Sequence, residues 1–263
     1  MGAVCLVQSS IIQLKLTSHL IPYSLLVFFA TLFIYNLQRV FYKPALEKVE
    51  ISIRRKWIFK NQITLKLLIL IGCIGGGISF FFIEHSIFFY LTPLLILSLL
   101  YFLPFIRLRK NPGLKLFTLV IVWSIVTALV PMLLDNVEVV STQNSLHVLL
   151  RFCFLLGICI PFDIRDLEID KAETVSTIPH LMGENKARWL AFGCMLVYIA
   201  LIVLDFGMDF INPKIFLTLL LSAFINTGIV LMSNSKRSEY FYVAGVDGTM
   251  ILQGILLLAI DYF

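Results

Sequence analysis

Three aspartates, Asp163, Asp166 and Asp170, are the residues of this sequence best suited to chemistry. They follow a long apolar stretch at spacings of i, i+3 and i+7, so on one continuous helix they share a face. Carboxylates held that close repel one another unless a positive group lies between them. Mg²⁺ takes carboxylate oxygens and shares the phosphate oxygens of a substrate, so we predict a Mg²⁺ site here. Pro161 predicts a break or kink just before it.

A second polar cluster, Asn36, Arg39 and Lys43, ends an earlier apolar stretch with the same spacing. An arginine near an apolar helix is costly and usually faces the bundle interior or a polar cavity. Its planar fork suits a phosphate or a carboxylate. Two interpretations stay open: the two clusters hold a ligand between them, or Arg39 pairs directly with Asp163 or Asp166.

The acidic run also has a simpler interpretation, a solvated helix end neutralised by Arg165 and Lys171. Asp247 is an acid inside the last apolar stretch, which makes it either a functional candidate or the partner of Arg151 or of a backbone donor. His180 lies close to the acids and is a weaker candidate for a ligand.

The remaining histidines, His19, His85 and His147, fall in predicted outer loops, and we expect ordinary surface residues there. Gly72, with Gly75 to Gly77, forms a patch of small residues within an apolar stretch. We expect this patch to allow close helix packing.

The elements that carry these residues are predicted to be transmembrane helices. The chain is 59% hydrophobic and only 14% charged, well below the roughly 25% charge of a soluble domain, and several apolar stretches are long enough to cross a bilayer. A soluble globular domain is excluded, and residues 1–263 are expected to form one membrane domain. The predicted stretches are 2–14, which is short, and 20–41, 63–83, 87–105, 114–134, 146–162, 189–206, 215–232 and 240–260.

The Lys and Arg residues cluster in alternate loops, at about 43–60, 107–115, 165–188 and 236–237. Excess positive charge marks the cytoplasmic side of a membrane protein. The sequence therefore predicts an integral protein of the cell (inner) membrane with the acidic run facing the cytoplasm. The net charge of +5 is explained by this pattern, so no nucleic-acid partner is expected.

The chain resembles the UbiA superfamily of intramembrane prenyltransferases. Residues 163–171 (Asp-Ile-Arg-Asp-Leu-Glu-Ile-Asp-Lys) are similar to the second aspartate motif of that family. Residues 176–179 (Ser-Thr-Ile-Pro) and 183–187 (Gly-Glu-Asn-Lys-Ala) resemble its usual continuation. The resemblance implies an all-α, polytopic membrane bundle of about nine transmembrane helices, around a central cavity open to the cytoplasmic side.

The first motif of the family is degenerate in this chain. Asn36 is present, but Leu37 and Val40 occupy positions where the family has aspartates, and Ser176 replaces the basic residue before the Thr-Leu-Pro-like element. Arg39 and Lys43 lie nearby instead, and a fixed cation can stabilise a departing pyrophosphate much as a metal does.

The resemblance implies transfer of an isoprenoid group from a prenyl diphosphate to a small or lipid-like acceptor, with Mg²⁺-assisted loss of pyrophosphate. Aromatic side chains would shield a prenyl cation. The implied metal ligands are Asp163, Asp166 and Asp170; the implied catalytic residues are Asp166, Asp170 and Arg39; the implied substrate-binding residues are Asn36, Arg39, Lys43, Arg165 and Lys171; and the candidate aromatic residues are Tyr35, Phe41, Tyr42 and Trp123.

Two alternatives remain open. A non-catalytic protein that binds prenyl diphosphate would explain the missing first motif. A small transporter would also place charges between helices, although the sequence shows no internal repeat.

Overall fold

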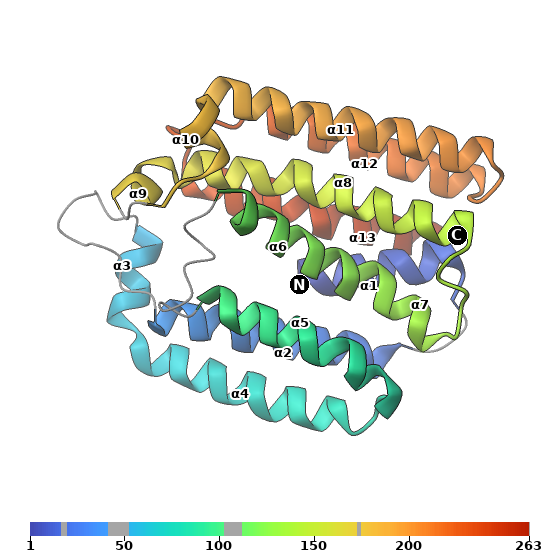
Figure 1. Cartoon of the computed structure of the whole chain (residues 1–263), viewed down its shortest axis with the longest axis horizontal. Helices are drawn as coiled ribbons and strands as arrows, with labels where there is room; N and C mark the ends of the chain where they lie inside the picture. The colour runs from blue at the N-terminus through green and yellow to red at the C-terminus, as the bar shows by residue number, and fades with distance from the viewer. Residues whose placement is uncertain (17–19, 42–52, 103–111, 173–174, 263) are drawn as a thin grey trace.

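The described part of the chain is helical throughout. A computed structural model describes residues 1–16, 20–41, 53–102, 112–172 and 175–262, and contains no strand within these ranges. The helices run lengthwise side by side as a bundle (Figure 1). In chain order they are α1 Gly2–Leu14, α2 Ile21–Phe41, α3 Ile53–Lys60, α4 Gln62–Phe80, the 3₁₀ turn η1 His85–Ile87, α5 Phe88–Phe102, α6 Pro112–Ser124, the π-helix η3 Ile125–Leu129, α7 Val130–Leu134, α8 Thr142–Arg165, α9 Leu167–Ala172, α10 Ile178–Met182, α11 Glu184–Gly207, α12 Pro213–Leu231, the π-helix η4 Phe241–Val246 and α13 Asp247–Tyr262.

Seven helical stretches of the described residues are long and apolar enough to cross a membrane, and two further apolar helices are shorter. The short ones are α1 and the segment Phe88–Leu100. Together they correspond to the nine predicted apolar stretches, so the prediction of an all-α, polytopic helical bundle is confirmed. The short first stretch was also predicted correctly: α1 covers 13 residues, or about 20 Å of helix.

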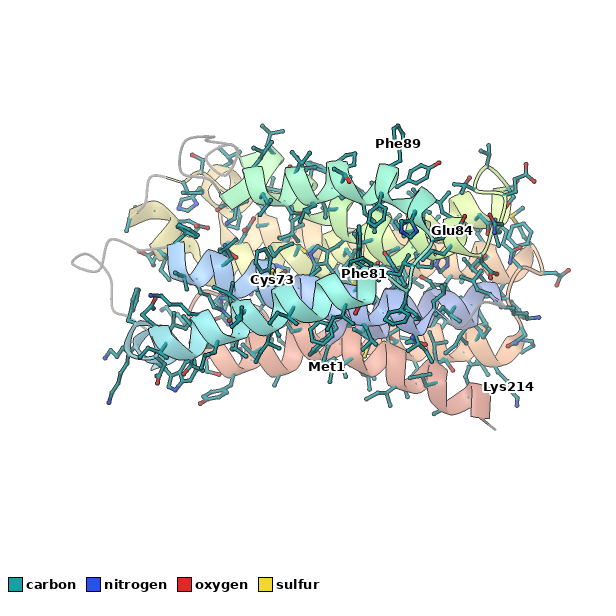
Figure 2. The ribbon with its side chains drawn as sticks, turned by 90° about the horizontal axis from the view of Figure 1, so that it is seen from below. Met1, Cys73, Phe81, Glu84, Phe89 and Lys214 are labelled. Carbon is teal, nitrogen blue, oxygen red and sulfur yellow. The ribbon has the colours of Figure 1, made fainter. Side chains whose placement is uncertain are left out.

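The bundle is apolar both inside and outside. A core of buried residues, among them Phe154, Met195 and Leu219, joins α8, α11 and α12. The outward faces carry large apolar side chains too, and Phe89 is 81% exposed. Figure 2 shows such side chains, including Phe89, projecting outward between the two ends of the molecule. An apolar surface of this extent is typical of contact with lipid rather than water.

Several of the helices that carry candidate residues finish at the same end of the bundle. We call the end at which α8 finishes, at Arg165, the acidic end. Figure 1 shows α3, α9 and α10 there, and α2 also finishes at this end. Glu84 and Lys214 lie toward the opposite end (Figure 2). The two clusters predicted to be functional are therefore carried by helices that finish at the same end.

The glycine patch brings α4 against α2. A Cβ atom at Gly72 would lie 2.8 Å from the backbone nitrogen of Phe33 and 2.9 Å from the carbonyl oxygen of Phe29. Only a glycine fits so close an approach. The predicted packing role of the patch is confirmed for this position.

Hydrogen bonds attach α1 and α2 to η3, the π-helical segment that precedes Pro131 of α7. A proline has no N–H, so it leaves carbonyl groups on the preceding turn without their helical donor. The Ser10 hydroxyl donates to the Thr127 carbonyl at 2.7 Å, and the Tyr23 hydroxyl donates to the Val126 carbonyl at 2.5 Å. These bonds position α1 along the interior of the bundle.

Candidate functional site

The acidic run does not form one continuous helix. α8 continues through Pro161 to Arg165, and the break falls at Asp166, whose φ and ψ are −87° and 7°. The Asp166 N–H donates to the Phe162 carbonyl at 3.0 Å, and its carbonyl accepts the N–H of Asp170 at 2.8 Å. Asp166 therefore closes α8 and opens α9. No break falls at Pro161, because the proline lies inside α8, and the kink predicted there stays a prediction.

Lys115 bridges two of the predicted aspartates. Its Nζ lies 2.8 Å from Asp163 Oδ1 and 2.8 Å from Asp170 Oδ2. The side chain of Lys115 is 12% exposed, and those of Asp163 and Asp170 are 8% and 1% exposed. Lys115 comes from the first turn of α6, so the site joins α6 to α8 and α9. Its ammonium group holds together two carboxylates that would otherwise repel.

Asp166 faces a different cation. Arg165 binds it through two hydrogen bonds, from Nε to Oδ1 at 3.0 Å and from Nη2 to Oδ2 at 2.7 Å. The Arg165 guanidinium also lies over the rings of Phe162 and Tyr242, 5.0 and 5.7 Å from their centroids. Glu239 and Asp247 act on it electrostatically. A bidentate ion pair with two aromatic neighbours fixes the plane of this guanidinium.

The expected cluster of three carboxylates is consequently not formed. Within the described residues, no group of three or more His, Cys, Asp or Glu side chains is arranged to hold a metal ion. Asp166 lies at the break between α8 and α9, and its carboxylate pairs with Arg165 rather than with the lysine that joins Asp163 to Asp170.

The remaining pair of carboxylates suits a divalent cation. The oxygens of Asp163 and Asp170 converge on one point, where the Lys115 ammonium lies. The second oxygen of Asp163, Oδ2, is buried and has no hydrogen-bond partner among the described residues. Mg²⁺ usually takes one or two protein carboxylates and completes its shell with water and substrate phosphate. The residues present therefore fit Mg²⁺ as a two-carboxylate site.

The second predicted cluster is partly described. Asn36 is 2% exposed, its Nδ2 donates to the Leu32 carbonyl at 2.7 Å, and its Oδ1 accepts from Arg39 Nη1 at 3.1 Å. Lys43 lies outside the described residues, as does Tyr42. One turn-length before Arg39, the ring of Tyr35 packs edge-on against Trp123 of α6 at a centroid distance of 6.3 Å. Two of the four candidate aromatic residues are thus brought together by tertiary contact.

A direct ion pair between Arg39 and Asp163 is not formed. Asp163 Oδ1 accepts from Lys115, and its Oδ2 has no partner in the described part of the chain. Lys171, predicted to bind substrate, has an exposed side chain on α9. Phe41 is 73% exposed. The structure therefore places Asp163 and Asp170 together, and it places Lys171 at the surface.

The burial and the hydrogen-bond partners of three other polar residues can be compared with expectation. His147 is 3% exposed, and its Nε2 lies 2.9 Å from Ser10 Oγ, so the prediction of a surface histidine is wrong. The reason is that α8 begins at Thr142, which places His147 within the bundle. Asp247 does not pair with Arg151, which instead donates to the Leu6 carbonyl and to Ser10. His180 Nδ1 is hydrogen-bonded to Thr177 Oγ1 at 2.7 Å.

Comparisons with known proteins give a likeness of structure only. No protein-family model and no curated protein matches the sequence. The apo structure of a UbiA homologue from Aeropyrum pernix K1 matches over 100% of this chain and 98% of that one, with a TM-score of 0.74 and 14% identity. A UbiA homologue from Archaeoglobus fulgidus, bound to GPP and Mg²⁺, matches over 100% of this chain and 96% of that one, with a TM-score of 0.69 and 13% identity. This chain has the UbiA fold.

The resemblance predicted from residues 163–187 is thereby confirmed at the level of the fold. The UbiA fold here carries a feature that the sequence analysis missed. By sequence, Lys115 is only one of the loop charges at 107–115, although it is the residue that joins Asp163 to Asp170. One signal pointed to it: Lys115 is the second residue of the predicted stretch 114–134, and a lysine there either reaches to the interface or pairs with an acid inside the bundle.

Proposed function

We propose that this protein is an intramembrane prenyltransferase. It binds a prenyl diphosphate at the acidic end and transfers the isoprenoid group to a small or lipid-like acceptor. The observation that carries the proposal is the buried triad in which Lys115 lies between Asp163 and Asp170. A group of this kind offers both cation-binding oxygens and a phosphate-binding ammonium. Support comes from the UbiA homologue of the same fold that is bound to GPP and Mg²⁺.

The carboxylates of Asp163 and Asp170 would hold Mg²⁺ together with the diphosphate. When bound, Mg²⁺ would neutralise negative charge on the diphosphate and on the pyrophosphate that leaves. Lys115 is a compact point charge with three donors on a flexible stem, so it can exchange a carboxylate partner for a phosphate oxygen. That exchange would release Asp163 and Asp170 at the moment at which the ligand arrives.

Arg39 and Arg165 would supply the remaining positive charge. Arg165 is oriented by Asp166 and by two aromatic rings. In this proposal Asp166 serves by positioning Arg165 rather than by binding metal. Arg39, held by the buried Asn36, would contact the diphosphate in place of a metal bound by the first motif. Lys43 and Lys171 would add longer-range attraction at the rim.

The isoprenoid tail would lie among apolar helices, toward the Tyr35–Trp123 pair. Each buried methylene contributes about 0.8 kcal/mol to binding. Aromatic faces in this region would stabilise an allylic cation formed when the C–O bond breaks. We place the acidic end on the cytoplasmic side of the cell membrane, as the positive loops predict.

The test is binding and turnover by the purified protein in detergent. Calorimetric titration with GPP and longer prenyl diphosphates, with Mg²⁺ or with EDTA, measures binding, and released pyrophosphate measures turnover in the presence of candidate acceptors. Asp163→Asn and Asp170→Asn should each lower affinity at least tenfold in Mg²⁺. Glu168→Gln, an exposed acid of the same segment, is the matched control. Equal affinity in all four proteins would rule the triad out as the site.

One observation favours a second candidate, a protein that binds a prenyl diphosphate without ionising it. Leu37 and Val40 replace the carboxylates of the first motif, which leaves Asp163 and Asp170 as the only carboxylates proposed here to hold Mg²⁺. The same titration separates the two functions. Saturable binding with no pyrophosphate release, across acceptors of different chemistry, would identify the binding protein.

A further inference from the structure

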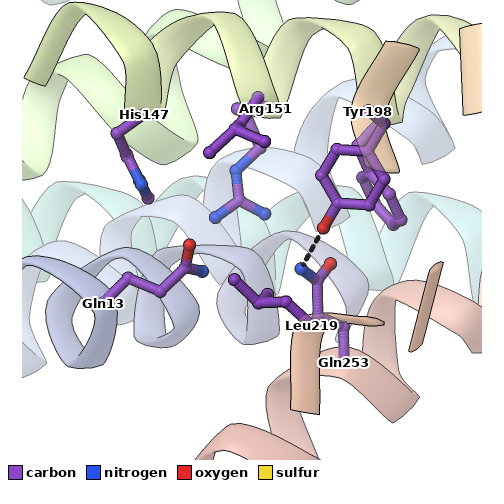
Figure 3. Close-up of a pocket in the computed structure, with 8 residues that line it drawn as sticks. Gln13, His147, Arg151, Tyr198, Leu219 and Gln253 are labelled. Carbon is purple, nitrogen blue, oxygen red and sulfur yellow. Dashed lines mark hydrogen bonds between the residues drawn. The ribbon is translucent and has the colours of Figure 1, made fainter. Parts of the chain in front are cut away.

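A second polar site lies within the bundle, away from the acidic end. Figure 3 shows a cavity into which His147, Arg151 and Tyr198 point from one side and Gln13 and Gln253 from the other. These residues come from α1, α8, α11 and α13, and all of them are buried. Arg151 lies twelve residues before Asp163 on α8, which is about 18 Å along the helix. The cavity is therefore distinct from the proposed diphosphate site.

Arg151 is 4% exposed and is held by donated hydrogen bonds on one side only. Its Nη2 donates to the Leu6 carbonyl at 3.0 Å and to Ser10 Oγ at 3.1 Å. Its Nε is buried with no partner in the described part of the chain. The Ser10 hydroxyl donates to the Thr127 carbonyl, so its lone pairs are left to accept from Arg151 and His147. This network fixes the guanidinium beside the cavity.

The hydrogen-bond partners of Arg151 are neutral, so they do not balance its positive charge. No carboxylate of the described residues forms an ion pair with it. A guanidinium at such depth in a membrane protein is costly, and arginines there are normally paired. A water molecule in the cavity would satisfy Nε, but it would leave the charge uncompensated. An anion would satisfy both the donor and the charge.

We propose that this cavity binds one small monovalent anion, of the size of chloride, with Arg151 as its principal ligand. The free space has room for about one water molecule, so an organic acid with a ring is too large.

Gln253 is able to supply a second donor. Its Nε2 donates to the Tyr198 hydroxyl at 2.9 Å, and its Oε1 is buried without a partner among the described residues. Rotation of the amide by half a turn exchanges these two atoms without changing the shape of the side chain. The Tyr198 hydroxyl then donates to Oε1, and the amide NH₂ faces the cavity. Such a site offers the anion donors from two helices.

The first test compares anions at equal sodium concentration and ionic strength. The thermal unfolding midpoint of the purified protein is measured in chloride, bromide, nitrate and gluconate, the last being too large to enter. We expect the midpoint to rise by several degrees with increasing chloride or bromide, because a ligand that binds only the folded state stabilises it. Equal unfolding midpoints in chloride and gluconate at every concentration would overturn the proposal and would indicate that the cavity holds only water.

The second test supplies a counter-ion from the protein itself. Gln253→Glu places a carboxylate in the cavity with Arg151. We expect this variant to unfold in gluconate at a midpoint at least as high as that of the unaltered protein in chloride, and to lose its dependence on chloride. Lys214→Met, which removes an exposed cation, should keep the dependence. A Gln253→Glu protein that is less stable in every salt, or still responds to chloride, would count against an anion site at Arg151.

Discussion

Lys115 on α6 forms a buried ion pair with Asp163 on α8, with Nζ 2.8 Å from Oδ1. The same ammonium lies 2.8 Å from Asp170 Oδ2, so one cation serves two carboxylates. A lysine thus occupies the point between acids at which a metal ion was expected. Because the lysine is part of the chain, the carboxylates are compensated before any ligand arrives. This arrangement makes several predictions about binding and stability.

Replacing Lys115 should make the thermal stability of the protein depend on an added divalent cation. In Lys115→Met, the buried carboxylates of Asp163 and Asp170 lose the ammonium that lies between them, and breaking a buried ion pair typically costs about 3–5 kcal/mol. We expect a lower thermal unfolding midpoint in EDTA, and recovery of much of the loss in millimolar Mg²⁺. Lys214→Met is the control and should respond to neither. A Lys115→Met protein as stable as its parent in EDTA would show that the ion pair contributes little.

Arg39 should contribute more to the affinity for a diphosphate than to folding. A hydrogen bond to a charged group contributes about 1.5–3 kcal/mol, so Arg39→Gln should weaken prenyl diphosphate binding by at least tenfold in calorimetric titration. Its thermal unfolding midpoint should stay close to that of the parent, since the side chain is only half-buried. Lys60→Gln, an exposed cation of α3, is the matched control. Equal affinities for both variants would remove Arg39 from the binding site.

The glycines of α4 should differ sharply in their tolerance of a methyl group. A Cβ atom at Gly72 would lie 2.8 Å from the backbone of Phe33, whereas one at Gly77 meets nothing within 4 Å. We expect Gly72→Ala to destabilise the protein by about 1–3 kcal/mol, because α2 must move. Gly77→Ala should be neutral or stabilising by up to about 1 kcal/mol, because alanine suits a helix better. Thermal unfolding of both variants in the same detergent measures the difference in stability. Identical midpoints would contradict the close packing of α2 on α4.

Ser10 should contribute more to the stability of the protein than a serine that bonds only to its own helix. Ser10→Ala removes a donor to the Thr127 carbonyl and an acceptor for Arg151 and His147. Leaving such buried groups unsatisfied costs about 1–3 kcal/mol each. Ser98→Ala loses a single bond to Leu94 of α5 and should change stability by less than about 1 kcal/mol. Differential scanning calorimetry of the two variants measures the contrast, and an equal effect would mean that the network adds no stability.

Local features of the sequence were sufficient to predict the helices. Apolar stretches near 20 residues long can satisfy their backbone groups in lipid only as helices, and the stretches expected at 2–14 and 114–134 correspond closely to α1 and to α6 through α7. The acidic run at 163–170 and the residues that follow it were enough to indicate the UbiA fold. The packing role of Gly72 was also predictable, because a run of small residues inside an apolar helix permits close approach.

Which polar groups meet was decided by tertiary structure alone. Lys115 and Asp170 are 55 residues apart in the chain, and Arg151 and Leu6 are 145 apart. No local pattern encodes such pairs, because they depend on the rotation of each helix about its axis and on its neighbours. The turn at Asp166 likewise separates acids whose spacing suggests a common face. The sequence therefore determined that charged groups lie at the helix ends and within the bundle, and only the packed bundle determined which charges compensate one another.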